Sequence, residues 1–387
     1  MMIVAGEASG DAHAAKVIAA LRDAEPETDF EFFGAAGPKM RSVGVEAVVQ
    51  SDELSIVGLA EIGRALPMFL HASAALKRSA KERKPDAVIL VDFPEFNLKL
   101  AKSLKKQGLT IIYYISPQLW AWRKYRISTV KKYIDLMITI LPFEKAWYER
   151  RGVTNVEYAG SPLAREVRAR RSKDEFCRDH GVNASRKIIS LLPGSRHKEI
   201  VRILPVMLDS AVCLKKQLPD VQFVIAVSTV ENLSDVEQIL KNTRKINNSL
   251  PDAITIVDNE TYDALNASDA AAVASGTATL ETAIIGTPMV VVYKTSPLNY
   301  ALFEPFIDVP HYGLVNLIAE ERVAKELIQA EFTPETLSME LASLLAPQQN
   351  TAMRTKLKSV SDKLGRGGAS KRTAEAILRI IESHVGD

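Results

Sequence analysis

Short apolar runs alternate with longer amphipathic stretches along this chain, and the whole alternation occurs twice. The amphipathic stretches of the first series predict helices, for example over Asp11–Ala24, Glu61–Ala80 and Asn97–Gln107. The apolar runs predict strands at Ile3–Ala5, Phe30–Gly34, Ala87–Val91, Thr110–Ile115, Leu136–Ile140 and Val156–Tyr158. Strands that alternate with helices in this way form a parallel sheet covered on both faces.

The alternation restarts after a charged stretch that runs from Gly160 to Arg186 and contains Ser161-Pro162. The second series predicts strands at Ile188–Leu192, Gln222–Ala226, Ile254–Val257, Ala270–Ala274 and Met289–Val292. A chain of 387 residues is too long for one ordinary core. We therefore expect an α/β protein with two Rossmann-like domains whose parallel sheets face a central cleft. The expected bounds are 1–162 and 163–350, with C-terminal helices over 351–387.

Composition excludes several classes of protein. The net charge of +2 is too small to indicate a nucleic-acid surface, so no nucleic-acid partner is expected. No secretory pattern begins the sequence, and no apolar run approaches the ~20 residues of a membrane span. Cys177 and Cys213 fit no metal spacing, and the six histidines are scattered, so we expect reduced thiols in the cytosol and no metal site.

In open parallel sheets ligands bind at the carboxyl ends of the strands, so the loops after the strands are the candidate sites. The first loop reads A-G-E-A-S-G-D and contains Gly6, Glu7 and Ser9. One interpretation is a plain strand-to-helix turn with Ser9 or Asp11 as the helix cap. The interpretation we favour is a backbone-lined binding site, in which Glu7 would repel a phosphate but accept a hydrogen bond from a sugar hydroxyl.

The second loop reads V-D-F-P-E-F-N, and Asp92 follows an otherwise apolar run. A lone carboxylate in that position is costly to bury without a partner. As a cap for a helix beginning near Asn97 it stands five residues too early. Asp92 is therefore the first candidate for a general base, because desolvation raises a carboxyl pKa toward the working range. Glu95 is a weaker second candidate.

The third loop reads S-P-Q-L-W-A-W-R. Trp120 and Trp122, with Gln118 and Arg123 nearby, form either a lip that contacts a sugar or acyl group or ordinary aromatic packing under a loop. The sequence does not decide between the two.

The second half offers two loops suited to an anion. In L-L-P-G-S-R the Arg196 side chain joins free main-chain N–H groups at a helix start, which suits a diphosphate, although a solvated arginine on a simple turn fits as well. In A-S-G-T-A-T-L-E a second helix start carries Ser275, Gly276 and Thr277, and Glu281 follows one turn later. Glu281 would contact a ribose diol or serve in a capping box.

In order and spacing, six of these stretches closely resemble the lipid-A-disaccharide synthase family. They are A-G-E-A-S-G-D, V-D-F-P-E-F-N, S-P-Q-L-W-A-W-R, L-P-F-E-K, L-L-P-G-S-R and S-G-T-A-T-L-E. The resemblance covers nearly the whole chain and implies a GT-B glycosyltransferase fold. It also implies the family's reaction, the inverting transfer of 2,3-diacylglucosamine from its UDP derivative to the 6-hydroxyl of 2,3-diacylglucosamine 1-phosphate. The product is the β-1′,6-linked lipid A disaccharide, and no cofactor is implied.

The resemblance carries roles to individual residues. Asp92 matches the catalytic base, and Glu7 matches a glutamate implicated in activity. The UDP donor site is implied at Arg196, Glu199, Ser275, Gly276, Thr277, Glu281 and Asn316. From the first and third loops themselves we expect an acceptor-side loop at Gly6, Ser9, Gln118 and Trp120. One departure is that Glu320 and Glu321 stand where many members have a glycine and then a basic residue.

Both implied substrates are lipids, so we expect a peripheral enzyme on the cytoplasmic face of the inner membrane of a Gram-negative bacterium. The stretch Glu61–Ala80 carries an apolar face with basic edges, which suits an interface, although a core-facing helix has the same pattern. The membrane-facing candidates are Ile62, Leu66, Phe69 and Leu70. The family includes a dimer that exchanges C-terminal parts, and the sequence does not show whether this chain is a homodimer.

Two alternatives stay open. Another GT-B enzyme acting on a UDP-amino sugar, such as an epimerase or a transferase to a polyprenyl acceptor, would share the nucleotide site. A non-catalytic nucleotide-sugar binder would also share it, but would not need Asp92 near an acceptor hydroxyl.

Overall fold

The structure is a computed structural model that describes residues 1–52, 62–227, 230–247, 249–251, 254–303, 309–365 and 367–385. It divides into two compact units, one of Met1–Pro162 with Gly367–Asp387 and one of Leu163–Arg366. The expected class, α/β with two parallel sheets, is confirmed. No helix among the described residues is both long enough and apolar enough to span a membrane.

Among its described residues, the first unit holds a seven-stranded parallel sheet in the order β3-β2-β1-β4-β5-β6-β7. The strands are β1 (Met2–Ala5), β2 (Phe33–Ala36), β3 (Glu46–Gln50), β4 (Val88–Val91), β5 (Ile111–Tyr114), β6 (Leu136–Thr139) and β7 (Val156–Tyr158). The helices are α1 (Ala8–Ala24), α2 (Pro38–Ser42), α4 (Ile62–Arg83), α5 (Pro94–Lys105), α6 (Ile127–Tyr133), α7 (Glu144–Glu149) and α18 (Ala369–Val385), with the short 3-10 turn η2 (Lys124–Arg126).

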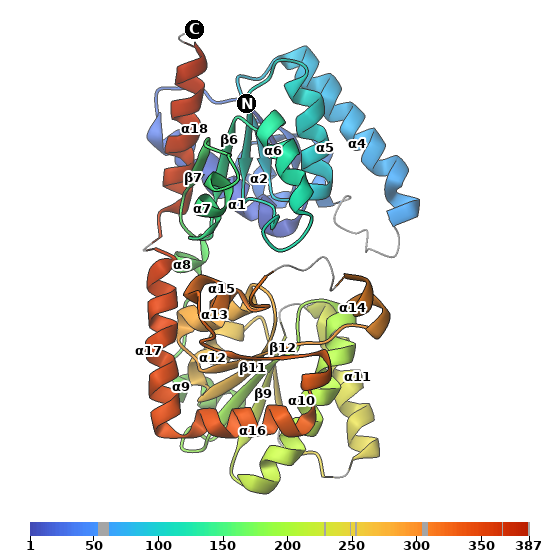
Figure 1. Cartoon of the computed structure of the whole chain (residues 1–387), viewed down its shortest axis with the longest axis vertical. Helices are drawn as coiled ribbons and strands as arrows, with labels where there is room; N and C mark the ends of the chain where they lie inside the picture. Colours follow the sequence, from blue (N-terminus) through green and yellow to red (C-terminus); the bar gives the residue numbers. More distant parts are fainter. Residues whose placement is uncertain are drawn as a thin grey trace. The chain divides into compact units, whose positions relative to one another are not determined.

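Helices cover both faces of this sheet. On one face α18 packs along α1, and their apolar residues share a core with Ile3, Ile89 and Tyr114 of the strands. On the other face α5 lies between α4 and α6 (Figure 1). The central strands are buried on both faces, which explains why they are continuous apolar runs rather than alternating ones.

Among its described residues, the second unit holds a six-stranded parallel sheet in the order β10-β9-β8-β11-β12-β13. The strands are β8 (Ile188–Leu192), β9 (Gln222–Val227), β10 (Ile254–Asp258), β11 (Ala270–Ala274), β12 (Met289–Tyr293) and β13 (Lys325–Ile328). The helices are α8 (Leu163–Glu166), α9 (Lys173–His180), α10 (His197–Gln217), α11 (Val230–Ile246), α12 (Thr261–Ala267), α13 (Ala278–Ile285), α14 (Pro297–Phe303), α15 (Leu314–Ala319), α16 (Pro334–Leu345) and α17 (Pro347–Lys363), with the 3-10 turn η4 (Gln329–Glu331).

The two C-terminal helices belong to different units. Helix α17 contacts α13, α15 and α16 of the second unit, whereas α18 contacts α1 of the first. Arg372 of α18 donates a 2.7 Å hydrogen bond to the carbonyl of Ala159, and Arg379 forms an ion pair with Glu157. The chain therefore returns to the first unit after the glycine-rich segment at 365–368.

Candidate functional site

In the first unit the turns after β1 and β4 lie side by side. The strand order reverses between these two strands, and Ala5 is paired with Val91 across them. Gly6 and Asp92 follow directly. A reversal of strand order is the place where open parallel sheets bind ligands. The sheet thus brings together the first two loops that were predicted as sites.

The turn at Asp92 has an unusual backbone. Asp92 and Phe93 are both left-handed, with φ of 47° and 50°. The Asp92 N–H donates to the Tyr114 carbonyl at 2.9 Å. The Asp92 carbonyl accepts hydrogen bonds from the Tyr113 hydroxyl at 2.6 Å and from Asn97 Nδ2 at 2.8 Å. Non-glycine residues in this region cost about 1–2 kcal/mol each, so these bonds fix a turn that the chain would otherwise leave.

The expected helix start at Asn97 is wrong, because α5 begins at Pro94 with Phe93 at the N-cap position. Asp92 is therefore one residue from the cap, and no side chain caps this helix. The fully buried Asn97 lies in the first turn and also donates to the Val91 carbonyl at 3.2 Å. A polar residue expected to start the helix instead holds the end of β4.

The ring of Phe93 leaves no room for a side chain at Gly6. A Cβ built on Gly6 would lie 2.2 Å from the ring of Phe93. That ring packs against Phe96 at 5.7 Å and against Phe69 of α4 at 6.1 Å between centroids. The absent side chain at Gly6 lets the turn at Asp92 close against the turn after β1.

Burial, and then the negative charge of Glu7, raise the pKa of Asp92 to about 6. A hydrogen bond with the main chain of Phe93 acts in the opposite direction. Glu7 occupies the N-cap position of α1 with an exposed side chain and makes no capping bond there. A carboxylate with a pKa near 6 is mostly ionised at pH 7 and is basic enough to accept a proton.

Other residues of the opening turn have different positions. Ser9 is exposed on the first turn of α1. Asp11 is buried and does not cap α1, because its carboxylate accepts hydrogen bonds from the N–H groups of Gly37, Lys39 and Met40 at 2.8–3.1 Å. It holds the start of α2 and is a structural residue.

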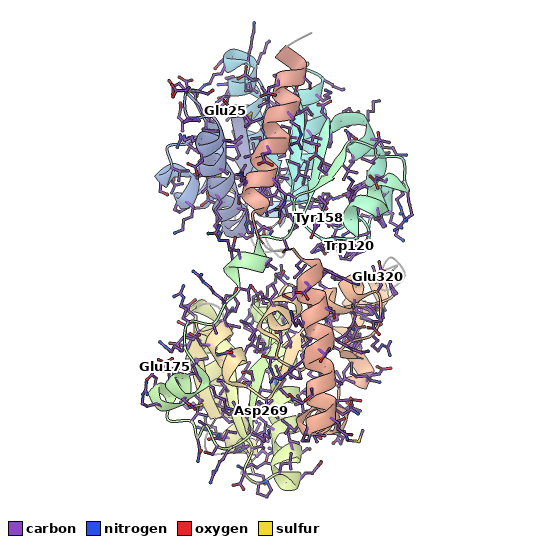
Figure 2. All side chains as sticks on the ribbon, turned by 90° about the vertical axis from the view of Figure 1, so that its left-hand side faces the viewer. Glu25, Trp120, Tyr158, Glu175, Asp269 and Glu320 are labelled. Atoms are coloured by element: carbon purple, nitrogen blue, oxygen red, sulfur yellow. The ribbon has the colours of Figure 1, made fainter. Side chains whose placement is uncertain are left out.

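The loop after β5 separates its two tryptophans. Trp120, labelled in Figure 2, is only 5% exposed and donates a 3.1 Å hydrogen bond from Nε1 to the buried Glu144. The packing interpretation therefore applies to Trp120. Trp122 is 39% exposed with the Arg123 guanidinium 4.1 Å from its ring, and Gln118 is exposed as well. Trp122, not Trp120, is the tryptophan that a ligand can reach.

The second unit repeats the arrangement of neighbouring turns. Its strand order reverses between β8 and β11, where Leu192 is paired with Val273. The two loops predicted to take an anion follow these strands. The sheet therefore brings Arg196 and Ser275–Thr277 to one switch point, as the carboxyl-end rule predicts.

A carboxylate occupies the first of these loops. Glu199, in the first turn of α10, accepts the N–H of Ser195 at 3.2 Å and pairs with Arg196 at 3.1 Å. A Cβ at Gly194, whose φ is 117°, would lie 2.6 Å from the Glu199 carboxylate. The loop thus already holds an anionic group against an N–H donor and a guanidinium at a helix N-terminus, which is the chemistry that binds phosphate.

In the second loop no side chain caps the start of α13. Ser275 donates its hydroxyl to the Tyr312 carbonyl at 2.7 Å, and Thr277 is exposed at the N-cap position of α13 without a capping bond. Gly276 has a φ of 151°, and a Cβ there would meet open space. Glu281 accepts a 2.9 Å hydrogen bond from the Tyr262 hydroxyl, so the capping-box interpretation does not hold. Burial raises the pKa of Glu281.

Asn316 is placed inside the protein. Its side chain is fully buried, donates to Glu326 and to the Ala324 carbonyl, and accepts the Ala324 N–H. Glu326 also accepts the N–H groups of Tyr312 and Gly313. Asn316 therefore shapes the loop behind Ser275 and presents no surface for a donor contact.

Helix α15 explains the departure at Glu320. Glu320, labelled in Figure 2, ends this helix in the left-handed region with a φ of 63°. Helices commonly end with glycine in this conformation, because glycine adopts it without strain. The next residue, Glu321, pairs with Lys356 at 3.2 Å.

Helix α4 presents an exposed leucine pair. Leu66 and Leu70, one turn apart, are 55% and 62% exposed. Phe69 differs from the expectation, because its half-buried ring packs against Phe93 and Phe96. The side chain of Ile62 lies outside the described part of the structure.

Sequence reasoning missed the residues that support these turns. Tyr262 follows β10, and Tyr293 ends β12 with its ring stacked on Tyr312 at 6.3 Å. Their positions at strand ends were an available signal. Tyr113 lies within an apolar run, where pattern gives no indication of its hydrogen bond. Among the described residues, no three His, Cys, Asp or Glu side chains form a group that could hold a metal ion.

Comparison with known proteins gives consistent results. A family model described as lipid-A-disaccharide synthetase matches residues 1–381. The lipid-A-disaccharide synthase of Trichlorobacter lovleyi is 42% identical over 99% of this chain and 97% of its own length. That of Syntrophus aciditrophicus is also 42% identical, over 99% and 98%.

Solved structures show the same fold at low sequence identity. UDP-GlcNAc 2-epimerase from Neisseria meningitidis, bound to UDP-GlcNAc, is 14% identical with a TM-score of 0.66 over 98% of this chain and 99% of its own. Anabaena HepE, in complex with UDP and glucose, is 10% identical with a TM-score of 0.55 over 99% and 98%. These likenesses confirm the GT-B fold and nothing finer.

Proposed function

Since this chain belongs to the lipid-A-disaccharide synthetase family, we propose that Asp92 is the general base of the glycosyl transfer that the family performs. The chain is a glycosyltransferase that forms the lipid A disaccharide. Its substrates are a nucleotide sugar and a lipid acceptor, and we assign these as UDP-2,3-diacylglucosamine and 2,3-diacylglucosamine 1-phosphate.

In the proposed reaction Asp92 takes the proton of the acceptor 6-hydroxyl. The oxygen forms a bond to the anomeric carbon of the donor while the bond from that carbon to the UDP oxygen breaks. One in-line displacement inverts the anomeric carbon, so one base is sufficient and no covalent enzyme intermediate forms. The observation that carries this assignment is the position of Asp92 at the switch point of the first sheet, with a pKa raised to about 6.

Glu7 has two proposed effects. Its charge makes Asp92 a stronger base, and its exposed carboxylate is placed to accept a hydrogen bond from a sugar hydroxyl. Gly6, Ser9 and Gln118 belong to the acceptor side in this proposal, and Trp122 takes the place that was expected for Trp120.

The second unit binds the donor in this proposal. Arg196 and the N–H groups at the start of α10 stabilise the negative charge that develops on the departing UDP. Glu199 occupies that position now, so the diphosphate must displace its carboxylate from the Ser195 N–H. The second helix start is provided by Ser275, Gly276 and Thr277. Glu281, which is oriented by the hydrogen bond from Tyr262, accepts hydrogen bonds from the ribose hydroxyls.

We place the enzyme at the cytoplasmic face of the inner membrane. The support is the exposed pair Leu66 and Leu70, together with the acyl chains of both substrates. The packing of α18 on α1 of the same chain needs no second copy. The proposal therefore assigns the base and the donor loops to one chain. A homodimer is compatible with this assignment but is not needed for it.

The test of this function is an assay of the purified protein with both substrates, followed by mass spectrometry. We expect one disaccharide 1-phosphate for each UDP released, and no release without the acceptor. Release of UDP with an epimerised free sugar, or binding of the donor without product, would show that the chain acts as one of the alternative proteins.

A further inference from the structure

Two arginines converge on one carboxylate close to the turn at Asp92. Arg123 and Arg126 each donate to a different oxygen of Glu95, and the contact from Arg126 measures 2.7 Å. Glu95 lies in the first turn of α5, three residues beyond Asp92. The arrangement combines two positive charges and one negative charge.

Stability alone does not account for this arrangement. The side chain of Glu95 is 52% exposed, and exposed ion pairs contribute little to stability. Arg123 nevertheless adopts a left-handed backbone with a φ of 55°, which costs stability. Its guanidinium is also oriented by the ring of Trp122, 4.1 Å away. Backbone strain at a partly exposed, oriented guanidinium is typical of a functional residue.

The pair lies in the same electrostatic neighbourhood as the proposed base. Burial, and then the charge of Asp92, raise the pKa of the Tyr113 hydroxyl, which is bonded to the Asp92 carbonyl. The charges of Arg126 and Glu95 also act on that hydroxyl. Cationic groups are therefore present near the turn but not at the carboxylate of Asp92 itself, whose pKa they do not lower.

We propose that Arg123 and Arg126 bind the phosphate monoester of the acceptor, and that this phosphate displaces the carboxylate of Glu95. This inference rests on the proposed function, because only an acceptor with a 1-phosphate needs such a site. The 1-phosphate is carried by C1 and the reacting 6-hydroxyl by the carbon attached to C5, so the two groups flank the ring oxygen and are separated in space. A phosphate site near the base but separate from it is what that substrate requires.

The chemistry of the pair fits this ligand. Guanidinium groups bind phosphate oxygens through paired, charge-assisted hydrogen bonds. A phosphate monoester carries roughly −1.5 to −2 charges at pH 7, more than the carboxylate that it replaces. Glu199 in the second unit stands in the same relation to Arg196, so a carboxylate holds an arginine at each of the two proposed phosphate sites.

The alternative is that these ion pairs only fasten the loop 116–126 to α5. Kinetics with two acceptors separates the alternatives: 2,3-diacylglucosamine 1-phosphate and the same sugar without its phosphate. In wild-type protein we expect kcat/KM to favour the phosphorylated acceptor. In Arg126→Met and Arg123→Met we expect that preference to fall at least about tenfold, with the donor KM unchanged.

Arg151→Met is the matched control, because Arg151 also lies 4.1 Å from a tryptophan ring, that of Trp147, in the same unit. It should keep the wild-type preference. If Arg126→Met slows both acceptors equally, or if Arg151→Met loses the preference to the same degree, the ion pairs only anchor the loop and the inference is wrong.

A direct binding measurement separates this inference from the proposed function. Glucosamine 1-phosphate is titrated into the full chain by calorimetry, without donor. Binding that weakens at least about tenfold in Arg126→Met supports the phosphate site even if no disaccharide is ever formed. No binding to wild type, or equal binding to both proteins, overturns the inference even if the enzyme is active.

Discussion

The hydroxyl of Tyr113 donates a 2.6 Å hydrogen bond to the main-chain carbonyl of Asp92. This hydrogen bond connects β5 to the left-handed turn that carries the proposed base. Asn97 donates to the same carbonyl, so two buried side chains fix the backbone of the residue that carries the proposed base. We regard both as positioning residues.

Tyr113→Phe keeps the ring and removes this hydrogen bond. We expect kcat to fall about fivefold with an unchanged donor KM, because one neutral hydrogen bond contributes about 1 kcal/mol. Tyr114→Phe is the control, since adjacent strand residues face opposite sides and Tyr114 lies in the core with α1 and α18. Steady-state kinetics of the two variants decides the matter, and equal losses would mean that Tyr113 has no positioning role.

The pH dependence of kcat/KM should show an acidic limb with an apparent pKa near 6, because Asp92 must be ionised to accept a proton. Glu7→Gln removes a like charge that disfavours ionised Asp92, so the limb should move to lower pH. Glu25→Gln, at the opposite end of α1, serves as the control and should leave the limb in place. If the acidic limb stays at the same pH in Glu7→Gln, the charge of Glu7 does not act on Asp92 and the prediction is wrong.

Glu320→Gly should stabilise the second unit. The substitution relieves a left-handed non-glycine residue at the end of α15, worth about 1 kcal/mol. In a unit of this size that corresponds to a rise of about 2–4 °C in its melting temperature. Glu321→Gly is the control, because it removes the ion pair with Lys356 at a residue without positive φ and should give no gain. Calorimetry of both variants measures the two melting temperatures, and a Glu320→Gly variant that melts no higher than Glu321→Gly would contradict the prediction.

Leu66→Ser with Leu70→Ser should weaken binding to anionic vesicles at least tenfold. A buried leucine contributes roughly 1.5–3 kcal/mol, and both side chains are exposed in the protein. Phe69 is not part of this test, because its substitution would disturb the contacts with Phe93 and Phe96. Met339→Ser changes a residue that is equally exposed, at 62%, in the second unit. Vesicle sedimentation in which all variants bind alike would remove α4 from the membrane proposal.

The central strands were predictable because strands buried on both faces are continuous apolar runs. One edge strand of each sheet was not. Glu46–Gln50 is half-exposed, with polar residues at both ends, and Lys325–Ile328 is short and carries two charged residues. Neither has the pattern of a buried strand, so the sequence analysis missed both.

The loops of the site were also predictable, since the carboxyl-end rule selected the turns at both reversals of strand order. What each side chain does there depends on contacts between distant segments. Trp120 is buried because Glu144, which is 24 residues later, accepts its N–H. The buried Asn316 is bonded to Glu326, ten residues later, and the ring of Phe69 packs against those of Phe93 and Phe96. Local sequence contains none of these contacts.

The central claim is that Asp92 is the base, and Asp92→Asn tests it most directly. Burial and Glu7 raise the pKa of Asp92 to about 6, so the ionised carboxylate destabilises the fold above pH 6, and that effect declines as the pH falls from 6 toward 3.8, the ordinary pKa of an aspartate. At pH 8 the asparagine variant should therefore melt no lower than wild type, which excludes unfolding as a cause of lost activity.

The measurement is disaccharide formation and UDP affinity for wild type and Asp92→Asn at pH 8. We predict that turnover falls about 10²–10⁴-fold, the range for loss of a general base, while UDP affinity is unchanged. Folded Asp92→Asn protein that retains turnover within about tenfold of wild type would contradict the account.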